Sequence, residues 1–235
     1  MASGGPGPCA RERVVSVAWL VTGTDTGVGK TFASVALLHQ LRGRGLRAVG
    51  MKPVAAGSAH TAQGWRNEDA LALLAASNPR PAYADLNPFA LPAATAPQLA
   101  EREAGVEVAL PPLLAAFSRL SALADVVVVE GAGGWLAPLG DGLEHADLAR
   151  AIGGEVLLVV GLRLGCLSHA RLTARAIQAD GCRLAGWIGN RVDPGFEPVD
   201  DYLDLLREAL PAPCLGVLDH GADPRAAARA LALPL

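Results

Sequence analysis

Short apolar runs alternate with amphipathic stretches along most of this chain. Strand-like runs cover residues 13–21, 46–54, 125–131, 155–161, 184–190 and 214–219. Between them, the spacing of apolar positions predicts helices over residues 30–42, 165–180 and 199–210, and another helix that opens at Asn67. Strands that alternate with helices build βαβ units, so the pattern predicts an α/β fold with a mainly parallel sheet.

Several of these runs are apolar without interruption, as at residues 126–129 and 156–160. Strands that lack polar alternation are buried on both faces, which predicts a doubly wound sheet. We expect a single domain over residues 14–235, preceded by a disordered Gly/Pro-rich leader at residues 1–13. Ligands of such sheets bind beyond the carboxyl ends of the strands, so the residues that follow each run are the candidates for chemistry.

Composition and charge narrow the classes of partner. The net charge is −3 and the arginines are scattered along the chain, which disfavours nucleic acid. No apolar run approaches the roughly 18 residues that span a bilayer, so we expect no membrane partner. The four cysteines form no Cys-x-x-Cys pair, which predicts reduced thiols and a cytoplasmic location.

The first run leads into "VTGTDTGVGKT" at residues 21–31. Five residues separate Gly23 from Gly29, one more than in the usual phosphate loop. Glycine amides can approach phosphate closely, Lys30 can reach terminal phosphates, and Thr31 can ligate Mg²⁺ at the positive end of the next helix. The stretch therefore predicts a phosphate loop and, with the parallel sheet, a fold of the P-loop NTPase type.

The second run ends at Lys52, where Pro53 prevents a helix from starting. Such a lysine either extends into water or holds an anionic intermediate. We favour the second role because the strand of Lys52 is expected beside the phosphate loop. We expect the replacement of Lys52 by glutamine to remove turnover and to leave the fold intact.

Two acidic positions are candidates for a metal site. Glu130 follows four consecutive valines, which is where a carboxylate can organise a metal ion in a phosphate-loop enzyme. Asp69 is either a second carboxylate of that site or, like Glu68, an acid that complements the dipole of the helix opened by Asn67. Sequence alone leaves both interpretations of Asp69 open.

The glycines at positions 131, 133 and 134 follow Glu130 and offer a second stretch of open backbone to an anion or a substrate. His145 and His169 have no partners at metal-ligand spacing, so we interpret them as ordinary core or surface histidines.

Seven segments together resemble the dethiobiotin synthetases of biotin synthesis in order and spacing, from about residue 15 to residue 217. They are "GTDTGVGKT", "GMKPVAAG", "NEDALAL", "VVVVEGAGGWLAPL", "VVGLRLGC", "HA…LTA" and "LAGWIGN". The resemblance implies an ATP-dependent ligase with Mg²⁺ as cofactor. One amine of 7,8-diaminopelargonate captures CO₂ as a carbamate, ATP phosphorylates it, and the second amine closes the ring with loss of phosphate.

The resemblance also implies a role for each matching residue. Lys30 contacts the carbamate and the γ-phosphate, and Lys52 stabilises the carbamate, so these two are the implied catalytic residues. The residues implied to bind nucleotide and metal are Gly27, Val28, Gly29, Lys30, Thr31, Phe32, Asp69, Glu130, Gly131, Ala132, Gly133, Asn190 and Arg191. Within this set, Thr31, Asp69 and Glu130 are implied to bind Mg²⁺, and Asn190 is implied to bind adenine. The implied substrate contacts are Thr26, Lys52, Gly133 and Ser168. Residues 164–166 are implied to reach a substrate at a dimer interface, so a homodimer is expected.

The chain departs from the family pattern at a few positions. Gly27 stands where several members have glutamate, Ala56 where serine is usual, and Ser168 where asparagine is common. Residues 218–220 read "LDH" in place of the usual "PWL", which affects the expected base pocket.

Three other functions remain as alternatives. Cobyrinic and cobyric acid synthases share a related ATP domain but need a glutaminase domain, for which this chain offers no cysteine motif. Partition-type switch ATPases carry a lysine five residues before the loop lysine, and here that residue is Asp25. The last alternative is a module that binds nucleotide without turnover.

Overall fold

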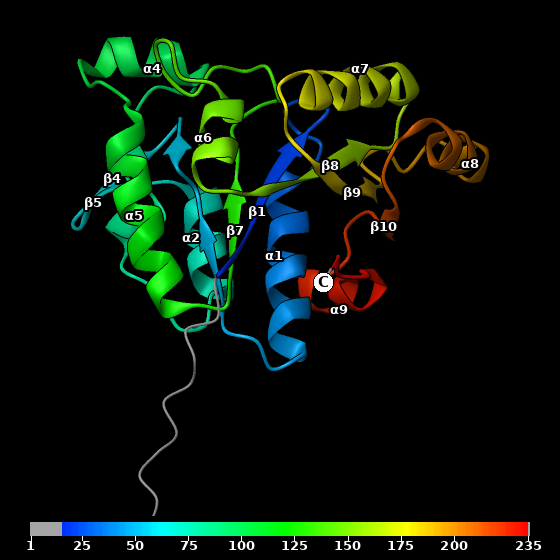
Figure 1. The fold of residues 1–235 in the computed structure, drawn as a ribbon, viewed down its shortest axis with the longest axis horizontal. Coiled ribbons are helices and arrows are strands. Elements are labelled where there is room, and N and C mark those ends of the chain that lie inside the picture. The colour runs from blue at the N-terminus through cyan, green and yellow to red at the C-terminus, as the bar shows by residue number, and fades with distance from the viewer. Residues whose placement is uncertain (1–15, 235) are drawn as a thin grey trace, which may run out of the picture.

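Parallel strands form the centre of the computed structural model, which describes residues 16–234 (Figure 1). The six-stranded sheet has the order β10-β9-β8-β1-β7-β2, and all of its neighbouring strands are parallel. The strands are β1 (Val17–Gly23), β2 (Ala48–Met51), β7 (Val126–Glu130), β8 (Glu155–Gly161), β9 (Leu184–Asn190) and β10 (Cys214–Leu218). The predicted α/β fold with a doubly wound parallel sheet is confirmed.

Helices cover both faces of this sheet. One face packs against α1 (Lys30–Gly43), α2 (Glu68–Ala76) and α9 (Pro224–Ala227), which continues into a 3₁₀ turn, η1 (Ala228–Ala230). The other face packs against α5 (Leu110–Leu123), α6 (His145–Ala151), α7 (Cys166–Ala179) and α8 (Val199–Ala209). Figure 1 shows α5 beside the β7–β2 half of the sheet and α7 and α8 beside the β8–β10 half.

The valines of β7 show why its sequence lacks polar alternation. Val127 and Val129 belong to the core on the α5 side, whereas Val126 and Val128 belong to the core on the α1 side. Successive side chains of a strand point to opposite faces, so a strand covered by helices on both sides needs apolar residues at every position. The expectation that this strand is buried on both faces is confirmed.

The segment between β2 and β7 holds the smaller elements. These are β3 (Val54–Ala55) paired with β6 (Phe89–Ala90), the hairpin of β4 (Ala59–Thr61) and β5 (Gly64–Arg66), and the helices α3 (Tyr83–Leu86) and α4 (Pro97–Ala104). None of these elements was predicted from the sequence, and neither were α5 and α6.

Two strand boundaries differ from the prediction. β1 continues past residue 21, because Thr22 and Gly23 pair with β8. β2 stops at Met51 because the Lys52 N–H donates to the carbonyl oxygen of Leu86 instead of to a neighbouring strand of the sheet. The predicted leader at residues 1–13 lies outside the described residues.

β7 lies between the strand of Lys52 and the strand that leads into the phosphate loop. β2 therefore does not pair with β1. This order places Glu130, at the end of β7, between the phosphate loop and Lys52.

No helix in the part of the chain that the structure describes is long and apolar enough to cross a membrane.

Candidate active site

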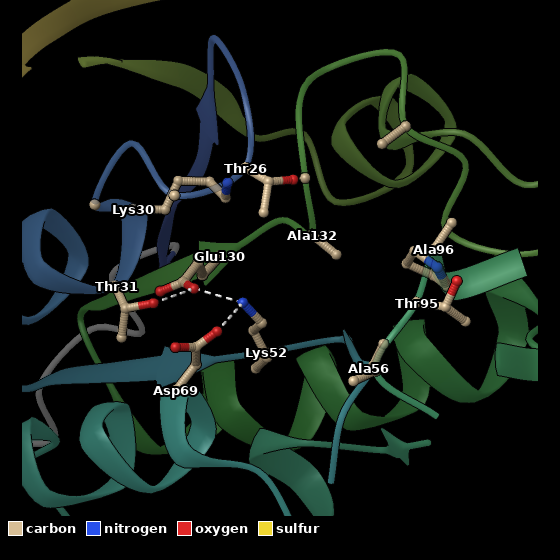
Figure 2. A pocket seen from close by; sticks show the side chains of 16 residues that line it. Thr26, Lys30, Thr31, Lys52, Ala56, Asp69, Thr95, Ala96, Glu130 and Ala132 are labelled. Atoms are coloured by element: carbon tan, nitrogen blue, oxygen red, sulfur yellow. Dashed lines mark hydrogen bonds and ion pairs between the residues drawn. The ribbon is translucent and has the colours of Figure 1, made fainter. Parts of the chain in front are cut away.

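Three neighbouring strand ends converge on one site. β7 pairs with β1 through Val21 and Glu130, and with β2 through Met51 and Val129. Parallel strands bring their carboxyl ends to one edge of the sheet, so the phosphate loop, Glu130 and Lys52 meet there. Figure 2 shows their side chains around a common cavity.

The phosphate loop turns into α1 through two glycines with left-handed backbone. The φ angle is 74° at Gly27 and 86° at Gly29, which caps α1. A Cβ atom on Gly29 would lie 2.0 Å from Nδ2 of Asn190, so this position also needs the space that glycine leaves. The loop geometry therefore explains both glycines before Lys30, although the spacing from Gly23 is not the usual one.

Lysine and carboxylate side chains form one connected cluster beyond this loop. The Lys52 Nζ atom lies 2.6 Å from Oε1 of Glu130 and 2.9 Å from Oδ2 of Asp69. The Thr31 hydroxyl donates to the same Glu130 Oε1 at 2.8 Å. Asn67 caps α2 through its side-chain Oδ1, as predicted, and thereby orients the first turn in which Asp69 lies. The structure thus brings together Thr31, Lys52, Asp69 and Glu130.

Burial makes the charges of this cluster interdependent. Lys52 and Glu130 are 4% and 0% exposed. Burial opposes the charged form of Lys52, but Glu130 and Asp69 outweigh it and raise the pKa of Lys52. Burial likewise opposes the charged form of Asp69, and the Lys52 ammonium overcomes this and lowers the pKa of Asp69. Lys52 and Asp69 are therefore both ionised at neutral pH.

Lys30 has a different electrostatic environment. Its Nζ donates to the carbonyl oxygen of Asp25 at 3.0 Å. Burial, and then repulsion from Lys52, lower the pKa of Lys30 to about 8. An anion bound at the loop would compensate this charge. Lys30 and Lys52 are the only lysines in the chain, whose other cationic side chains are arginines and histidines.

The donor atoms fit the Mg²⁺ ion that the family implies. Oε2 of Glu130 is buried without a hydrogen-bond partner among residues 16–234. The other oxygen of this carboxylate accepts from the Thr31 hydroxyl and from Lys52, which also donates to Asp69. Mg²⁺ takes a few hard oxygen ligands from protein and the rest from phosphates and water, as this set allows. No cluster of three or more His, Cys, Asp or Glu residues suited to a metal lies among residues 16–234, so the site is not an all-protein metal cage.

The turn after β7 is less open than expected. The Gly131 N–H donates to the carbonyl oxygen of Val21, and the Ala132 N–H donates to Nε2 of His145 at 3.2 Å. These two amides are therefore not free to bind an anion. The prediction of open backbone is wrong at Gly131 and stays a prediction at Gly133 and the glycine after it. His145 is a core histidine, as predicted, but its role as the acceptor for Ala132 was missed.

Two cavities meet at the phosphate loop. The larger, of about 660 Å³, contains both lysines, Asp69 and Glu130, together with Thr26, Ala132 and Gly133. The smaller, of about 300 Å³, is lined by Phe32, residues 190–192 and residues 219–222. Gly27 and Gly29 line both cavities.

The remaining predicted residues lie near this site or apart from it. Val28 is buried below the loop, and its carbonyl oxygen accepts from the Asn190 amide. Asn190 and Arg191 line the smaller cavity. Ser168 is exposed on α7 and lines neither cavity in the single chain. Its substrate contact stays a prediction that requires a second copy of the chain.

Sequence comparison assigns the chain to a family. The profile described as AAA domain matches residues 18–226. The chain is 60% identical over 218 residues to an ATP-dependent dethiobiotin synthetase of Xanthomonas oryzae pv. oryzae, with 93% of this chain and 97% of the relative covered. It is 62% identical over 203 residues to the ATP-dependent dethiobiotin synthetase of Xylella fastidiosa strain 9a5c, with 86% and 90% covered. The chain belongs to the ATP-dependent dethiobiotin synthetase family. This confirms the resemblance found in the sequence motifs, and with it the prediction of an ATP-dependent ligase.

Solved structures confirm the type of fold of this synthetase family member. The signal recognition particle receptor FtsY of Elizabethkingia anophelis superposes with a TM-score of 0.56 at 18% identity, covering 96% of this chain and 64% of the receptor chain. A MinC:MinD cell division complex of Aquifex aeolicus matches with a TM-score of 0.55 at 15% identity, covering 87% and 81%. At these identities the match shows a shared P-loop fold and carries no functional conclusion.

Proposed function

We propose that this protein carboxylates 7,8-diaminopelargonate and closes it to dethiobiotin in biotin synthesis, with MgATP as the source of energy. One amine adds to CO₂ and loses a proton, which gives a carbamate. A carbamate oxygen then attacks the γ-phosphorus of ATP and displaces ADP. The second amine attacks the carbonyl carbon, expels phosphate and closes the ureido ring.

The observation that carries this proposal is the pair of buried lysines in the larger cavity. Lys30 lies on the phosphate loop, and Lys52 lies beyond Glu130 in the same cavity. Both the carbamate and the transferred phosphoryl group are anionic, and cations held in a buried site stabilise such charge strongly. Lys52 is already charged and fixed by Glu130 and Asp69, so it needs no reorganisation to hold a carbamate.

No step of this reaction needs a covalent bond to the protein. Positioning the amine, CO₂ and the γ-phosphate within one cavity converts separate encounters into steps of a single complex. The cavity is also lined by small side chains: Ala56, Ala94, Thr95, Ala96, Pro97 and Ala137. The alanines and the proline suit the alkyl chain of the diamine, and Thr95 is the hydroxyl residue of this set, since Ala56 stands where the family has serine.

Thr31, Asp69 and Glu130 would hold the Mg²⁺ ion. When bound, the ion supplies charge neutralisation to the phosphates during transfer. Lys52 bridges the two carboxylates, so its ammonium group favours the ionised form of Asp69 and positions both side chains before nucleotide arrives.

We extend the proposal to a homodimer in the cytoplasm. A substrate contact by Ser168 requires a partner subunit, since this serine lines neither cavity of its own chain. Cys166, Cys182 and Cys214 form no disulfide, which suits a reducing compartment.

The switch-ATPase alternative receives no support from the site. Asp25, at the position of the switch lysine, accepts from Arg163 at 2.8 Å and from its own neighbour, the Thr26 N–H, at 2.7 Å. The loop thus carries a carboxylate engaged within its own chain where a switch ATPase has a cation.

Phosphate release from MgATP and bicarbonate, with and without 7,8-diaminopelargonate, tests the proposed function. We expect release only with the diamine, and a product heavier than the diamine by one carbonyl with two hydrogens lost. A substrate analogue with a single amine is the matched control, since it can form the carbamate but cannot close the ring. Release that does not depend on the diamine, or a product of unchanged mass, would refute the proposal.

A further inference from the structure

A third cavity lies between α1 and the C-terminal segment of the chain. It has a volume of about 390 Å³, and its lining includes His39 and Arg42 from α1, Arg225 from α9 and Arg229 from η1. Figure 1 shows α9 beside the C-terminal half of α1, whereas the phosphate loop precedes the first residue of this helix. Arg42 lies about 18 Å along the helix axis from Lys30. This cavity is therefore distinct from the active site.

Charge of one sign gathers around this cavity. Its lining contains three guanidinium groups and, among the described residues, no carboxylate. The Arg42 guanidinium donates to the carbonyl oxygen of Ala76 at 2.8 Å. None of the three guanidinium groups forms an ion pair with a carboxylate of residues 16–234. Clefts lined by charge of one sign focus the electric field and concentrate counter-ions, so this cavity attracts anions.

Local structure offsets only part of this positive charge. The C-terminal end of α1, at Gly43, carries about half a negative charge from the helix dipole. Asp223 supplies one carboxylate, which caps α9 by accepting from the backbone N–H groups of Arg225 and Ala226 at 3.0 Å. The two contributions together amount to about −1.5, against three guanidinium charges. A surplus of positive charge therefore remains around the cavity.

This surplus acts on His39, which is partly buried on α1. Burial lowers the pKa of His39, and the Arg225 and Arg42 charges lower it further. Asp223 acts in the opposite direction but does not reverse the shift. An anion bound between the arginines would compensate their charge and would raise the pKa of His39. His39 is therefore a local reporter of charge in the cavity.

We infer that this cavity binds inorganic pyrophosphate. Guanidinium groups recognise phosphate oxygens through paired hydrogen bonds. Arg42 lines the cavity from α1, whereas Arg225 and Arg229 line it from the C-terminal segment, so an anion with two phosphoryl groups can contact both walls. The remaining lining residues are small or polar: His39, Gln40, Gly43 and Ala228. An organic substituent would find no large apolar side chain among these described residues, so a free diphosphate fits better than its esters.

This inference is independent of the proposed reaction, and it is tested with the full chain in the absence of nucleotide and diamine. Ring-proton NMR of the histidines follows a titration with pyrophosphate at constant ionic strength and without a divalent metal. The His39 signal, assigned through His39→Gln, should shift until it saturates, and the pKa of His39 should rise. The signal of His60, an exposed histidine on β4, is the internal control and should not change.

A double variant separates this cavity from the phosphate loop, which can also bind pyrophosphate. Arg225→Gln with Arg229→Gln should weaken the binding reported by His39 about tenfold or more, since two charged donors are lost. Arg171→Gln with Arg175→Gln is the matched control. It removes two exposed arginines at the same spacing from α7, which packs on the other face of the sheet. The control should bind pyrophosphate as the parent protein does.

Three results would overturn the inference. One is a His39 signal that stays unchanged up to millimolar pyrophosphate. Another is equal weakening in the two double variants, which would show a response to net charge alone. The third is equal affinity for inorganic phosphate, which would show that one phosphoryl group suffices. Absence of diamine turnover in the parent protein would refute only the proposed reaction, because His39 reports on the cavity without any substrate present.

Discussion

Replacement of Lys52 by methionine should destabilise the fold as well as remove activity. Methionine keeps most of the volume of the lysine stem but removes the ammonium group. Lys52 is the nearest cation to the fully buried Glu130 carboxylate, at 2.6 Å. Without it, Glu130 keeps only the Thr31 hydroxyl as a side-chain hydrogen-bond partner among residues 16–234, and Lys30 is the lysine that still acts on its charge.

The size of this effect follows from burial. Removal of one partner of a buried ion pair typically costs about 3–5 kcal/mol of folding free energy. The pair with Asp69 adds little, because the Asp69 side chain is 44% exposed and solvent screens it. A domain is usually stable by about 5–15 kcal/mol, so the variant should fold but with much of its margin lost. This revises the expectation from sequence that a neutral residue at position 52 leaves the fold intact.

Urea unfolding followed by circular dichroism measures the loss. Lys52→Met with Glu130→Gln removes both charges and should be more stable than Lys52→Met alone, because no buried charge remains unpaired. Arg163→Gln breaks an ion pair whose side chains are 39% and 50% exposed, and as the control it should cost less than about 1 kcal/mol. A loss of unfolding free energy below about 1 kcal/mol in Lys52→Met would refute this reasoning. It would also be refuted if the loss in the double variant equalled the sum of the losses in the two single variants.

Three further predictions follow from the same geometry. Gly29→Ala should weaken ATP binding and lower stability more than Gly27→Ala does. Both glycines have positive φ, but only at Gly29 would the new Cβ atom clash with Asn190. Equal effects of the two variants in calorimetry and urea unfolding would contradict this. Asp69→Asn should raise the Mg²⁺ concentration for half-maximal turnover about tenfold or more, whereas an unchanged Mg²⁺ titration would remove Asp69 from the metal site. Burial lowers the pKa of His145 from 6.5 to about 4, so protons bind preferentially to the unfolded chain. The free energy of unfolding should therefore fall by about 3 kcal/mol between pH 6.5 and pH 4. Urea unfolding across this pH range should show the fall in the parent protein and not in His145→Gln.

The features of the fold that depend on residues close together in the sequence could be predicted. The uninterrupted valines before Glu130 predicted a strand buried on both faces, and the structure divides them between two cores. The Gly-Lys-Thr order predicted the phosphate loop because backbone approach and helix polarity are local properties. Lys52 and Asp69 could be proposed only as candidates, since each has an ordinary alternative in its own segment.

What could not be predicted depends on contacts between distant segments. The place of β7 between β1 and β2 is a property of topology, and it decides that Lys52 meets Glu130. The backbone at Gly131 looked open in sequence, but its N–H donates to β1, and the N–H of the next residue, Ala132, donates to His145 on α6. α5 was missed because its first turn contains prolines and its apolar positions do not stand out against neighbouring apolar residues.

The measurement that tests the central claim most directly follows oxygen from CO₂ into phosphate. In the proposed reaction a carbamate oxygen attacks the γ-phosphorus, and that oxygen leaves with phosphate when the ring closes. Turnover with ¹⁸O-labelled CO₂, quenched before exchange with water, should therefore yield phosphate that carries one labelled oxygen for each dethiobiotin formed. Phosphate without label, formed at the same rate as product, would contradict a phosphorylated carbamate at the site of Lys30 and Lys52.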